Sequence, residues 1–581
     1  MYFSRLVALA AGAARFQGVL SSRANTGERS HPPDLEVFDQ LLDALEVMQE
    51  SYFQPWLGTW PTAIDWTAAV IGTHVSGALS TLSQGLEKFG AAGIDDYKAK
   101  ENLITSYFSQ VLSFYFGQDA FSIRNQAYDD ILWVVLGWIE SINFINLHTK
   151  LFYGAGGETL GPPGRGLPDV LGNQTWHGNI WKPVFAHRAR IFWDLGEKGW
   201  DTKLCNGGMN WNPRLTPYKN AITNELFIAA SISMYQYFPG DDNTSPFNNP
   251  KEPGVVDPDI VGPAEPGDEK YLEAAKAAYK WILDVGMKNH QGLFADGFHI
   301  TGWDNVTHPG TRCDARDNMV YTYNQGVILT GNLGLWKATG DERYLFDGHL
   351  LVRNVISATG FDLDKGDPVD DIDRLKPGEL PPWRGLGRAG ILEEACDASG
   401  TCSQNGQTFK GIFFHHLTAF CAPLDDELRE GHSRACSHYL GWIRRNALAA
   451  LATRDADGKF GEWWTAGLLN TSTHALRADY LAVPSDAQAV DYRNFGVPND
   501  QTWRPRRAHS SGPGRDGFGV SDQVPMGQQA SAAKSGNSEG VTAGDASDPN
   551  NRGRGRTVET QSGGLAVLRA LWEISSAHAS D

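Results

Sequence analysis

The amino-acid sequence predicts an all-α fold, in which many short antiparallel helices form either a solenoid or a closed helical toroid. Apolar residues recur three and four positions apart along most of the 581 residues, which is the period of a helix with one buried face. Strand-like alternation is scarce, and loops rich in Gly, Pro, Asn and Asp separate the helical stretches. Because the chain contains no exact sequence repeat, a toroid fits it better than a regular solenoid.

About a dozen helical stretches follow one another along the chain. The first covers residues 35–48, where leucine, valine and phenylalanine repeat at helical spacing. The last follows a long polar tract, and we expect it to return to the same core. The same spacing predicts the other helices near residues 63–88, 100–117, 130–147, 180–197, 219–238, 269–287, 318–338, 342–358, 408–420, 425–453 and 563–575.

Composition and charge limit the classes of function. The chain is 41 % hydrophobic, too apolar for a wholly disordered protein, and its formal net charge of −18 opposes nucleic-acid binding. No stretch of roughly 18 apolar residues lacks a charge, so we expect no transmembrane segment. The last residues, 571–581, are too polar and too short for the tail of a lipid-anchor signal. We expect a monomer.

The first residues and the glycosylation sequons favour secretion, to the extracellular space or the cell wall. Residues 1–30 contain Arg5, then a short apolar run in which Ala11-Gly-Ala13 resembles a signal cleavage site. Several further arginines, two serines and no acid before Glu28 leave an organelle transit peptide as the alternative. Acceptor sequons begin at Asn173, Asn243, Asn305 and Asn470.

The chain contains six cysteines, an even set that suits an oxidising compartment. Cys396 lies close to Cys402 in sequence and Cys421 lies close to Cys436, so each of these pairs could close a small loop. Cys205 would then be left to pair with Cys313. Many connectivities are allowed, and six buried thiols are the alternative. The cysteines are Cys205, Cys313, Cys396, Cys402, Cys421 and Cys436.

Three segments interrupt the helical pattern. Residues 153–172 and 239–268 are rich in turn-forming residues, and we expect long surface insertions there. Residues 505–558 are rich in Gly, Ser, Asn and Arg and low in apolar content, which predicts a disordered low-complexity insertion. The expected organisation is a signal peptide or disordered N-terminus at 1–30, a catalytic domain at 31–504, the insertion at 505–558, and a final helix with its tail at 559–581.

Paired carboxylates are the strongest candidate chemistry. Asp129 and Asp130 directly precede a nearly unbroken apolar run with two tryptophans. Because burying a charge next to a hydrophobic core is costly, their position suggests that both carboxylates face a solvent-filled cleft. Retaining cleavage of a glycoside needs two carboxyl groups about 5–5.5 Å apart, which adjacent side chains can meet. No metal-binding or phosphate-binding motif stands out, so we expect neither metal nor cofactor. The remaining adjacent aspartates suit caps or loops: Asp95-Asp96, Asp241-Asp242, Asp370-Asp371 and Asp425-Asp426.

A series of sequence blocks supports the same chemistry. They are Tyr128-Asp-Asp-Ile-Leu-Trp, Gly207-Gly-Met-Asn-Trp-Asn-Pro, Tyr218-Lys-Asn-Ala-Ile-Thr-Asn-Glu-Leu-Phe, Leu293-Phe-Ala-Asp-Gly, Thr322-Tyr-Asn-Gln-Gly, Gly331-Asn-Leu-Gly-Leu-Trp-Lys-Ala-Thr-Gly-Asp and Phe409-Lys-Gly-Ile-Phe. Together and in this order they resemble glycoside hydrolase family 76, the endo-α-1,6-mannanases, in its fungal type. The resemblance covers most of residues 36–500 and the last helix. It implies an (α/α)6 barrel and a retaining mechanism without metal.

The same resemblance implies roles for individual residues. Asp129 matches the nucleophile and Asp130 the general acid/base of a double displacement. For the aromatic rings the alternative is core packing, and for Asn220 and Asn224 it is hydrogen bonding to the backbone or to each other. The positions expected to bind the glycan are Trp133, Trp211, Asn220, Asn224, Asp296, Tyr323, Asn324 and Gln325.

The expected protein is therefore a secreted retaining glycosidase that cleaves α-1,6-mannosidic linkages in mannan or in cell-wall glycans. Its loops are longer than those of the usual bacterial form and could narrow the cleft, which leaves endo against exo action open. Two alternatives remain. One is a transglycosylase that remodels mannose-containing anchor glycans, and the other is a mannan-binding scaffold with an inactive site.

Overall fold

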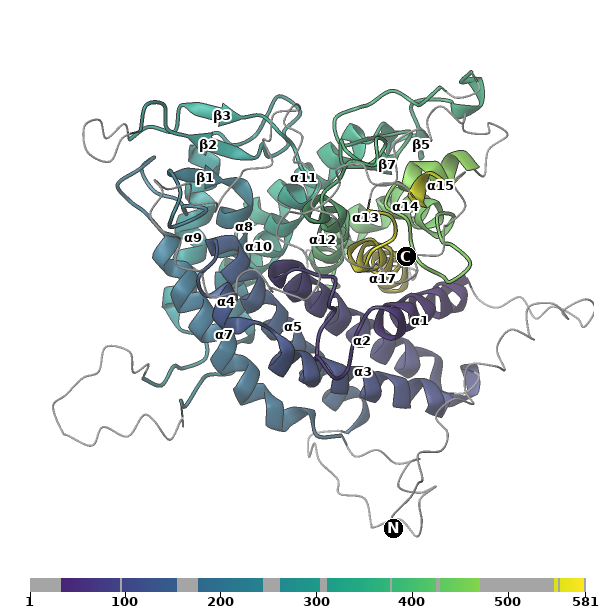
Figure 1. Cartoon of the computed structure of the whole chain (residues 1–581), viewed down its shortest axis with the longest axis horizontal. Helices are drawn as coiled ribbons and strands as arrows, with labels where there is room; N and C mark the ends of the chain where they lie inside the picture. Colours follow the sequence, from purple (N-terminus) through teal and green to yellow (C-terminus); the bar gives the residue numbers. More distant parts are fainter. Residues whose placement is uncertain are drawn as a thin grey trace, which may run out of the picture.

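A computed structural model of the chain describes residues 33–94, 97–153, 176–243, 262–303, 311–376, 379–424, 429–470, 548–551 and 554–578. Helices dominate these residues, and all but the short helices Ala120–Ile123 and Trp464–Asn470 correspond to predicted stretches (Figure 1). They are α1 (Pro33–Ser51), α2 (Asp65–Gly93), α3 (Tyr97–Gly117), α4 (Ala120–Ile123), α5 (Tyr128–Phe152), α7 (Lys182–Gly196), α8 (Ala221–Tyr237), α9 (Glu269–Asp284), α10 (Tyr323–Thr339), α11 (Arg343–Ala358), α12 (Gln404–Phe420), α13 (Arg429–His438), α14 (Leu440–Leu451), α15 (Trp464–Asn470) and α17 (Val558–His578).

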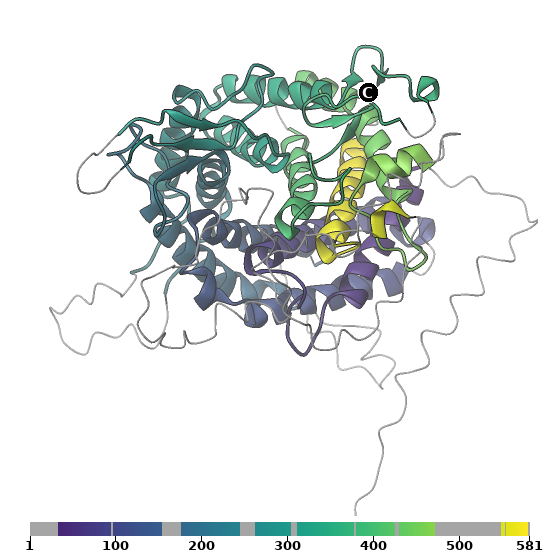
Figure 2. The same ribbon diagram turned by 45° about the horizontal axis from the view of Figure 1, so that its top comes forward.

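Six of these helices form a closed inner ring. Along the ring α2 packs on α5, α5 on α8, α8 on α10, α10 on α12 and α12 on α17, and α17 returns to α2. Figure 2 shows this closure, with α17 in yellow between α12 in green and the first helices in purple. The helices α1, α3, α7, α9, α11 and α14 pack against the ring. The predicted all-α toroid is therefore confirmed as an (α/α)6 barrel.

The two rings differ in how their sequences distribute apolar residues. In α8 every residue from Ala221 to Met234 is buried, because an inner helix contacts neighbours on all sides. The outer helix α9 buries one face around Tyr271 and Ala278 and exposes charged residues on the other. Among the described residues, only α5 is long and apolar enough to cross a membrane, but 78 % of its most apolar window is buried within the protein. It is a core helix of the barrel.

The helix boundaries differ from the prediction where short strands intervene. The expected helix at 219–238 begins at Ala221, because the residues before it pair as a strand. The expected helix at 318–338 begins only at Tyr323, because residues 318–322 form a non-helical connection. The expected helix at 425–453 consists of α13 and α14, with 425–428 outside the described residues. A strand of two or three residues has too little alternation to be recognised in a sequence.

These strands form three small antiparallel units, which lie at the top of Figure 1. The largest is a three-stranded sheet in the order β1-β2-β3, in which Asn220 lies opposite Gly297. Each of the other two is a two-stranded ribbon. The strands are β1 (Tyr218–Asn220), β2 (Gly297–His299), β3 (Ala315–Asp317), β4 (Phe361–Asp362), β5 (Asp367–Pro368), β6 (Gly387–Arg388) and β7 (Ile391–Leu392).

All six cysteines form disulfides, in the pairing that their spacing favoured. The longest loop, between the first two cysteines, closes over 108 residues, whereas the others close over 6 and 15. The alternative of six buried thiols is therefore wrong. The pairs are Cys205–Cys313, Cys396–Cys402 and Cys421–Cys436.

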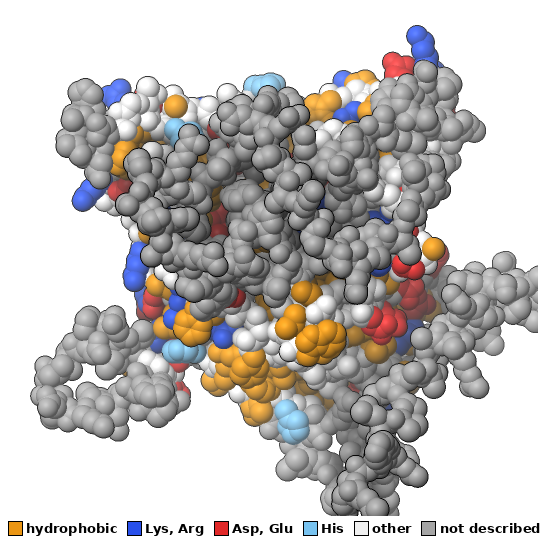
Figure 3. Space-filling view, in the orientation of Figure 1, with side chains coloured by type: hydrophobic (Ala, Val, Ile, Leu, Met, Phe, Trp, Pro, Cys, Tyr) orange, Lys and Arg blue, Asp and Glu red, His pale blue; other side chains and the backbone are white. Residues whose placement is uncertain are grey.

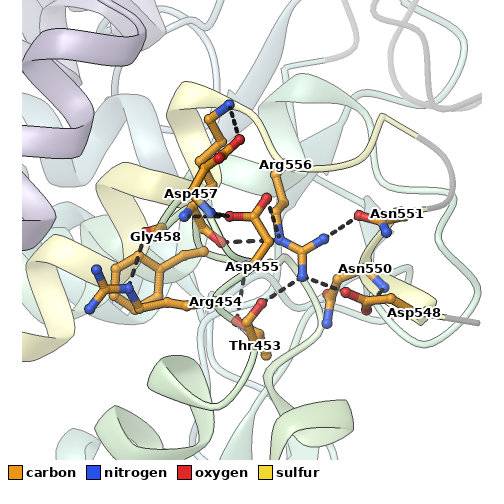
Figure 4. A network of polar contacts seen from close by, with 12 residues as sticks. Thr453, Arg454, Asp455, Asp457, Gly458, Asp548, Asn550, Asn551 and Arg556 are labelled. Carbon is orange, nitrogen blue, oxygen red and sulfur yellow. Dashed lines mark hydrogen bonds and ion pairs between the residues drawn. The ribbon is translucent and has the colours of Figure 1, made fainter. Parts of the chain in front are cut away.

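Residues 548–551 and 554–557 lead the chain back into the barrel. The Arg556 guanidinium donates hydrogen bonds to the carbonyl oxygen of Thr453 at 2.6 Å, to that of Lys459 at 3.0 Å and to the carboxylate of Asp548 at 2.6 Å (Figure 4). Its side chain is only 5 % exposed. These contacts dock the segment before α17 onto the loop that follows α14.

Several expectations concern residues that the structure does not describe. Residues 1–30 lie outside it, as do 154–175, 244–261 and 471–547, which take up much of the three expected insertions. Only the last part of the expected tract at 505–558 is described, at 548–551 and 554–558, and it packs against the barrel. Also outside the described residues are Asn173, Asn305, Asp95-Asp96 and Asp425-Asp426.

Candidate active site

The inner helices begin at the end of the barrel where the small strands lie. Tyr323, the first residue of α10, stacks on Phe409 near the start of α12, with ring centroids 3.8 Å apart. Trp66 near the start of α2 donates from Nε1 to Asn405 of α12 at 3.0 Å and stacks on Trp133 of α5. Helix N-termini carry a partial positive charge, so their meeting at one end favours carboxylates there.

Asp129 and Asp130 occupy the first turn of α5 at this end. Asp129 accepts two hydrogen bonds, one at Oδ2 from Nε1 of Trp211 at 3.0 Å and one at Oδ1 from the backbone N–H of Asp130 at 3.0 Å. Asp130 is buried, whereas Asp129 is half-buried. One helical turn therefore holds two carboxyl groups, and an indole N–H orients the first.

A tight loop brings Trp211 to this turn. Gly208 has a φ of +84°, and a Cβ there would lie 2.5 Å from the ring of Trp281, so the position requires glycine. The backbone N–H of Trp211 donates to the carbonyl of Tyr218, and its own carbonyl accepts from the N–H of Tyr128, both at 2.8 Å. The loop is thus fixed to both β1 and the start of α5.

Two of the predicted glycan contacts instead hold the backbone. Asn224 is fully buried, with Oδ1 accepting from the N–H of Met209 at 2.7 Å and Nδ2 donating to the carbonyl of Asn220 at 2.7 Å. Gln325 is equally buried and bonds both the N–H and the carbonyl of Phe294, at 2.8 and 2.9 Å. An amide offers one donor group and one acceptor, which matches an extended backbone segment. These two side chains therefore position the loops that carry the site.

A line of polar groups continues from Trp211 through Tyr218 to Asp296. The Trp211 and Tyr218 rings meet edge to face at 6.3 Å, and the Tyr218 hydroxyl donates to Oδ2 of Asp296. Asn324 donates from Nδ2 to Oδ1 of the same carboxylate at 3.4 Å. Burial, and then the charge of Asp296, raise the pKa of Tyr218 above its ordinary value, so the phenol stays a hydrogen-bond donor.

The other two asparagines among the predicted contacts each keep an amide oxygen that is unpaired within the described part of the chain. Oδ1 of Asn220 and Oδ1 of Asn324 are buried and have no hydrogen-bond partner among the described residues. Gly297 lies so close that a Cβ on it would come within 2.7 Å of the Asn220 Cα. Because buried polar atoms are normally paired, these two oxygens are candidates for binding sugar hydroxyls.

The predicted aromatic platforms differ in exposure. Trp133 is 3 % exposed and stacks on Trp66 with centroids 6.0 Å apart, so it packs within the barrel. Trp211 and Tyr323 keep part of their surface accessible. A sugar could pack its C–H face on these two rings.

Sequence reasoning missed Glu394. Its Oε1 accepts a hydrogen bond from the N–H of Thr322 at 2.8 Å and another from the Thr322 hydroxyl, which fixes the residue before Tyr323. Burial raises the pKa of Glu394 to about 8. The sequence signal was weak, because Glu393-Glu394 follows only the short apolar stretch Ile391-Leu392, unlike the long run beside Asp129-Asp130. Tyr218 and Phe409 were also missed, although each begins one of the quoted blocks.

Two clusters of the described residues offer possible metal ligands. In each cluster the cysteines are committed to disulfides, which removes the thiolates that zinc sites use. Two other donors then remain in each, fewer than a closed zinc site needs. The clusters are His349, His432 and Cys436, and Cys396, Asp397, Cys402 and Glu462.

Comparisons with known proteins find similarity to a family of glycosyl hydrolases over part of the chain. Residues 264–475 match the model of glycosyl hydrolase family 76. The mannan endo-1,6-alpha-mannosidases DCW1 and DFG5 of Saccharomyces cerevisiae are 21 % and 24 % identical to the chain over 275 residues, which is 46 % and 44 % of this chain. The matched segment covers 45 % and 46 % of those proteins, so it spans under half the length of each.

One similar solved structure is that of an inactive variant of the alpha-1,6-mannanase of a Salegentibacter species in complex with alpha-1,6-mannotriose. It has a TM-score of 0.47 and is 15 % identical, covering 93 % of this chain and 99 % of its own.

Proposed function

We propose that the chain is a retaining glycosidase of glycosyl hydrolase family 76, which cleaves α-1,6-mannosidic linkages in mannan or related cell-wall glycans. The observation that carries the proposal is the carboxyl pair in the first turn of α5, with Asp129 oriented by Trp211 and Asp130 buried beside it. The names of the matched relatives supply the substrate class.

The proposed reaction has two steps. Asp129 attacks the anomeric carbon while Asp130 gives its proton to the departing glycosidic oxygen, so that a glycosyl ester forms. Asp130 then takes a proton from water, whose oxygen attacks the anomeric carbon and releases Asp129. Two N–H donors on Asp129 suit the acceptor-only, ionised carboxylate that must attack.

Further side chains hold the glycan in this proposal. Asp296, Asn220 and Asn324 bond sugar hydroxyls, while Trp211 and Tyr323 pack against the sugar faces. Trp133, Asn224 and Gln325 do not contact the glycan in this proposal, but hold in place the elements that carry these groups. The three disulfides support secretion, since disulfides persist in oxidising compartments.

The test is incubation of the purified protein with α-1,6-mannan, with products identified by mass and the first anomer observed by proton NMR. We expect shorter α-1,6-mannooligosaccharides, released first as the α-anomer. Incorporation of a labelled sugar acceptor into longer chains would indicate transfer in place of hydrolysis. An absence of both products, or release of the β-anomer first, would contradict the proposal.

A further inference from the structure

A cavity of about 460 Å³ lies beside the end of the barrel that carries the carboxyl pair, between the start of α2, the end of α3, and α4. Asp65, the first residue of α2, is part of its wall. The Asp65 carboxylate accepts hydrogen bonds from Oγ of Ser122 at 3.3 Å and from the side-chain amide of Gln126. Gln126 precedes Asp129 by three residues, so the cavity adjoins the segment that carries the proposed nucleophile.

The rim of the cavity presents unusually exposed rings. Phe116 and Phe121 both line the cavity, and they are 72 % and 67 % exposed. The Phe116 ring also meets Trp181 edge to face at 6.1 Å. Figure 3 shows hydrophobic side chains gathered on the lower half of the face in view. Exposed apolar side chains that cluster in this way mark binding surfaces.

Polar groups line the same cavity. Oδ1 of Asp119 accepts the N–H of Ser122 at 2.9 Å, but Oδ2 is buried and has no hydrogen-bond partner among the described residues. The Arg188 guanidinium lies 3.5 Å from the centre of the Tyr115 ring and donates to Oε1 of Gln118 at 3.1 Å. The wall therefore combines flat apolar faces with an unsatisfied acceptor and a cation.

We propose that this cavity is an accessory binding site for a neutral glycan chain, which holds a strand of the substrate beside the catalytic end. The sugar C–H faces would pack on Phe116 and Phe121, and a hydroxyl would donate to Oδ2 of Asp119. A neutral, hydroxyl-rich ligand pairs that buried oxygen, whereas a lipid chain would leave it unpaired. The carboxylates of Asp65 and Asp119 and the net charge of −18 also oppose an anionic membrane surface.

The inference rests on the proposed function, because the bound strand is the substrate. Its test compares the Phe116→Ala/Phe121→Ala double variant with wild type on long α-1,6-mannan and on α-1,6-mannotriose. Each ring contributes a contact that changes affinity by roughly 2-fold to 10-fold. We expect KM for the polymer to rise several-fold and adsorption to mannan to fall, with kcat and KM for mannotriose unchanged. Asp119→Asn should weaken adsorption in the same direction.

Phe346→Ala is the matched control, because Phe346 lies on α11 and is 67 % exposed. We expect it to leave polymer and mannotriose kinetics unchanged. Equal polymer kinetics in wild type and the double variant would overturn the inference alone, whereas a wild type inactive on both substrates would overturn the proposed function. Loss of binding to phosphatidylcholine vesicles with mannan adsorption intact would assign the surface to lipid and also overturn the inference.

Discussion

At the residue scale, Trp211 links the loop after residue 206 to the proposed nucleophile. Its Nε1 donates to Oδ2 of Asp129, and its backbone is bonded to Tyr218 and Tyr128. The ring is therefore held in place by the main chain before it orients the carboxylate. A side chain that keeps the ring but lacks the N–H isolates this one contact.

Trp211→Phe should lower kcat by roughly 10-fold to 100-fold, because a hydrogen bond to a charged group contributes about 1.5–3 kcal/mol. The melting temperature should change little, because the ring still packs against Tyr218. The measurement is steady-state kinetics on mannan, with Trp383→Phe, a 40 % exposed tryptophan, as the control. Equal kcat in wild type and Trp211→Phe would show that the indole N–H does not serve the reaction.

Glu394 makes stability depend on pH. Its pKa is raised from 4.5 to about 8 by burial, so between these values the folded protein keeps a proton that the unfolded chain has lost. This contribution to the free energy of unfolding is complete below about pH 4.5 and is lost as the pH rises to about 8, by at most about 1.4 kcal/mol per pH unit.

Glu394→Gln keeps the neutral shape and removes the titration. Urea unfolding at pH 5 and pH 8 should therefore show a smaller loss of stability in the variant than in wild type. Asp397, whose pKa is raised to about 6 mainly by burial, supplies part of the remaining slope. Identical slopes in the two proteins would mean that Glu394 is ionised when folded.

At the scale of the element, the sequence predicted the helices well because each carries a long apolar repeat. The inner helix α8 and the outer helix α9 both contain enough turns for that period to be visible. The strands β1, β2 and β3 were not predictable, because each has three residues and takes its place from pairing with a distant segment. The start of α10 shifted because residues 318–322, which lead from β3 into the helix, are not helical.

The docking of α17 gives a test at this scale. Arg556→Met removes the guanidinium that bonds Thr453, Lys459 and Asp548, and leaves their oxygens to find other donors. We expect the free energy of unfolding to fall by on the order of 3 kcal/mol, because breaking a buried ionic network is costly. Denaturant unfolding monitored by circular dichroism provides the measurement. The exposed Arg374→Met, whose side chain is 86 % exposed, is the control and should change little.

Unchanged stability in Arg556→Met would contradict the role assigned to this network. Activity need not follow stability here, because none of the three partners lies among the groups proposed to contact glycan.

At the scale of the whole molecule, the last helix completes the barrel. α17 is an inner helix, packed between α12 and α2, although it follows α15 by almost ninety residues of sequence. Sequence pattern placed this helix in the same domain, but only the tertiary contacts assign it to the ring.

A chain that ends at residue 547 should therefore fail to fold. It would expose the apolar faces of α2 and α12 that α17 covers, and burial of such faces stabilises the barrel. Size-exclusion chromatography and thermal melting of the truncated protein are the measurements. A soluble monomer with a wild-type melting temperature would contradict the closed ring.

In the candidate site, too, local sequence patterns predicted some residues, whereas others depend on contacts between distant segments. Asp129 and Asp130 stood out because charge adjoined an apolar run, and the sequence blocks pointed to Trp211, Asn220, Asp296 and Asn324. For Asn224 the sequence left hydrogen bonding to the backbone as the alternative, which the structure bears out, whereas it gave no sign of that role for Gln325, since an amide in a buried helix has the same appearance in either role. Glu394 was recognised only from the hydrogen bond that it accepts from the N–H of Thr322, which lies 72 residues away in the sequence.

The central claim is that Asp129 is the nucleophile and Asp130 the general acid/base. Asp129→Asn and Asp130→Asn each preserve size, and each should lower turnover on mannan by at least about 10³-fold, given that acid–base catalysis alone contributes roughly 10²-fold to 10⁴-fold. Asp370→Asn/Asp371→Asn, in the described loop pair, should stay within a few-fold of wild type.

The most direct measurement uses α-mannosyl fluoride with added azide. Fluoride leaves without an acid and azide attacks without a base, so Asp130→Asn should regain turnover and yield the α-mannosyl azide. Asp129→Asn lacks the attacking carboxylate and should show no such rescue with retention. If both folded variants hydrolyse mannan near the wild-type rate, or if azide rescues Asp129→Asn to the α-azide, the assignment of the pair is wrong.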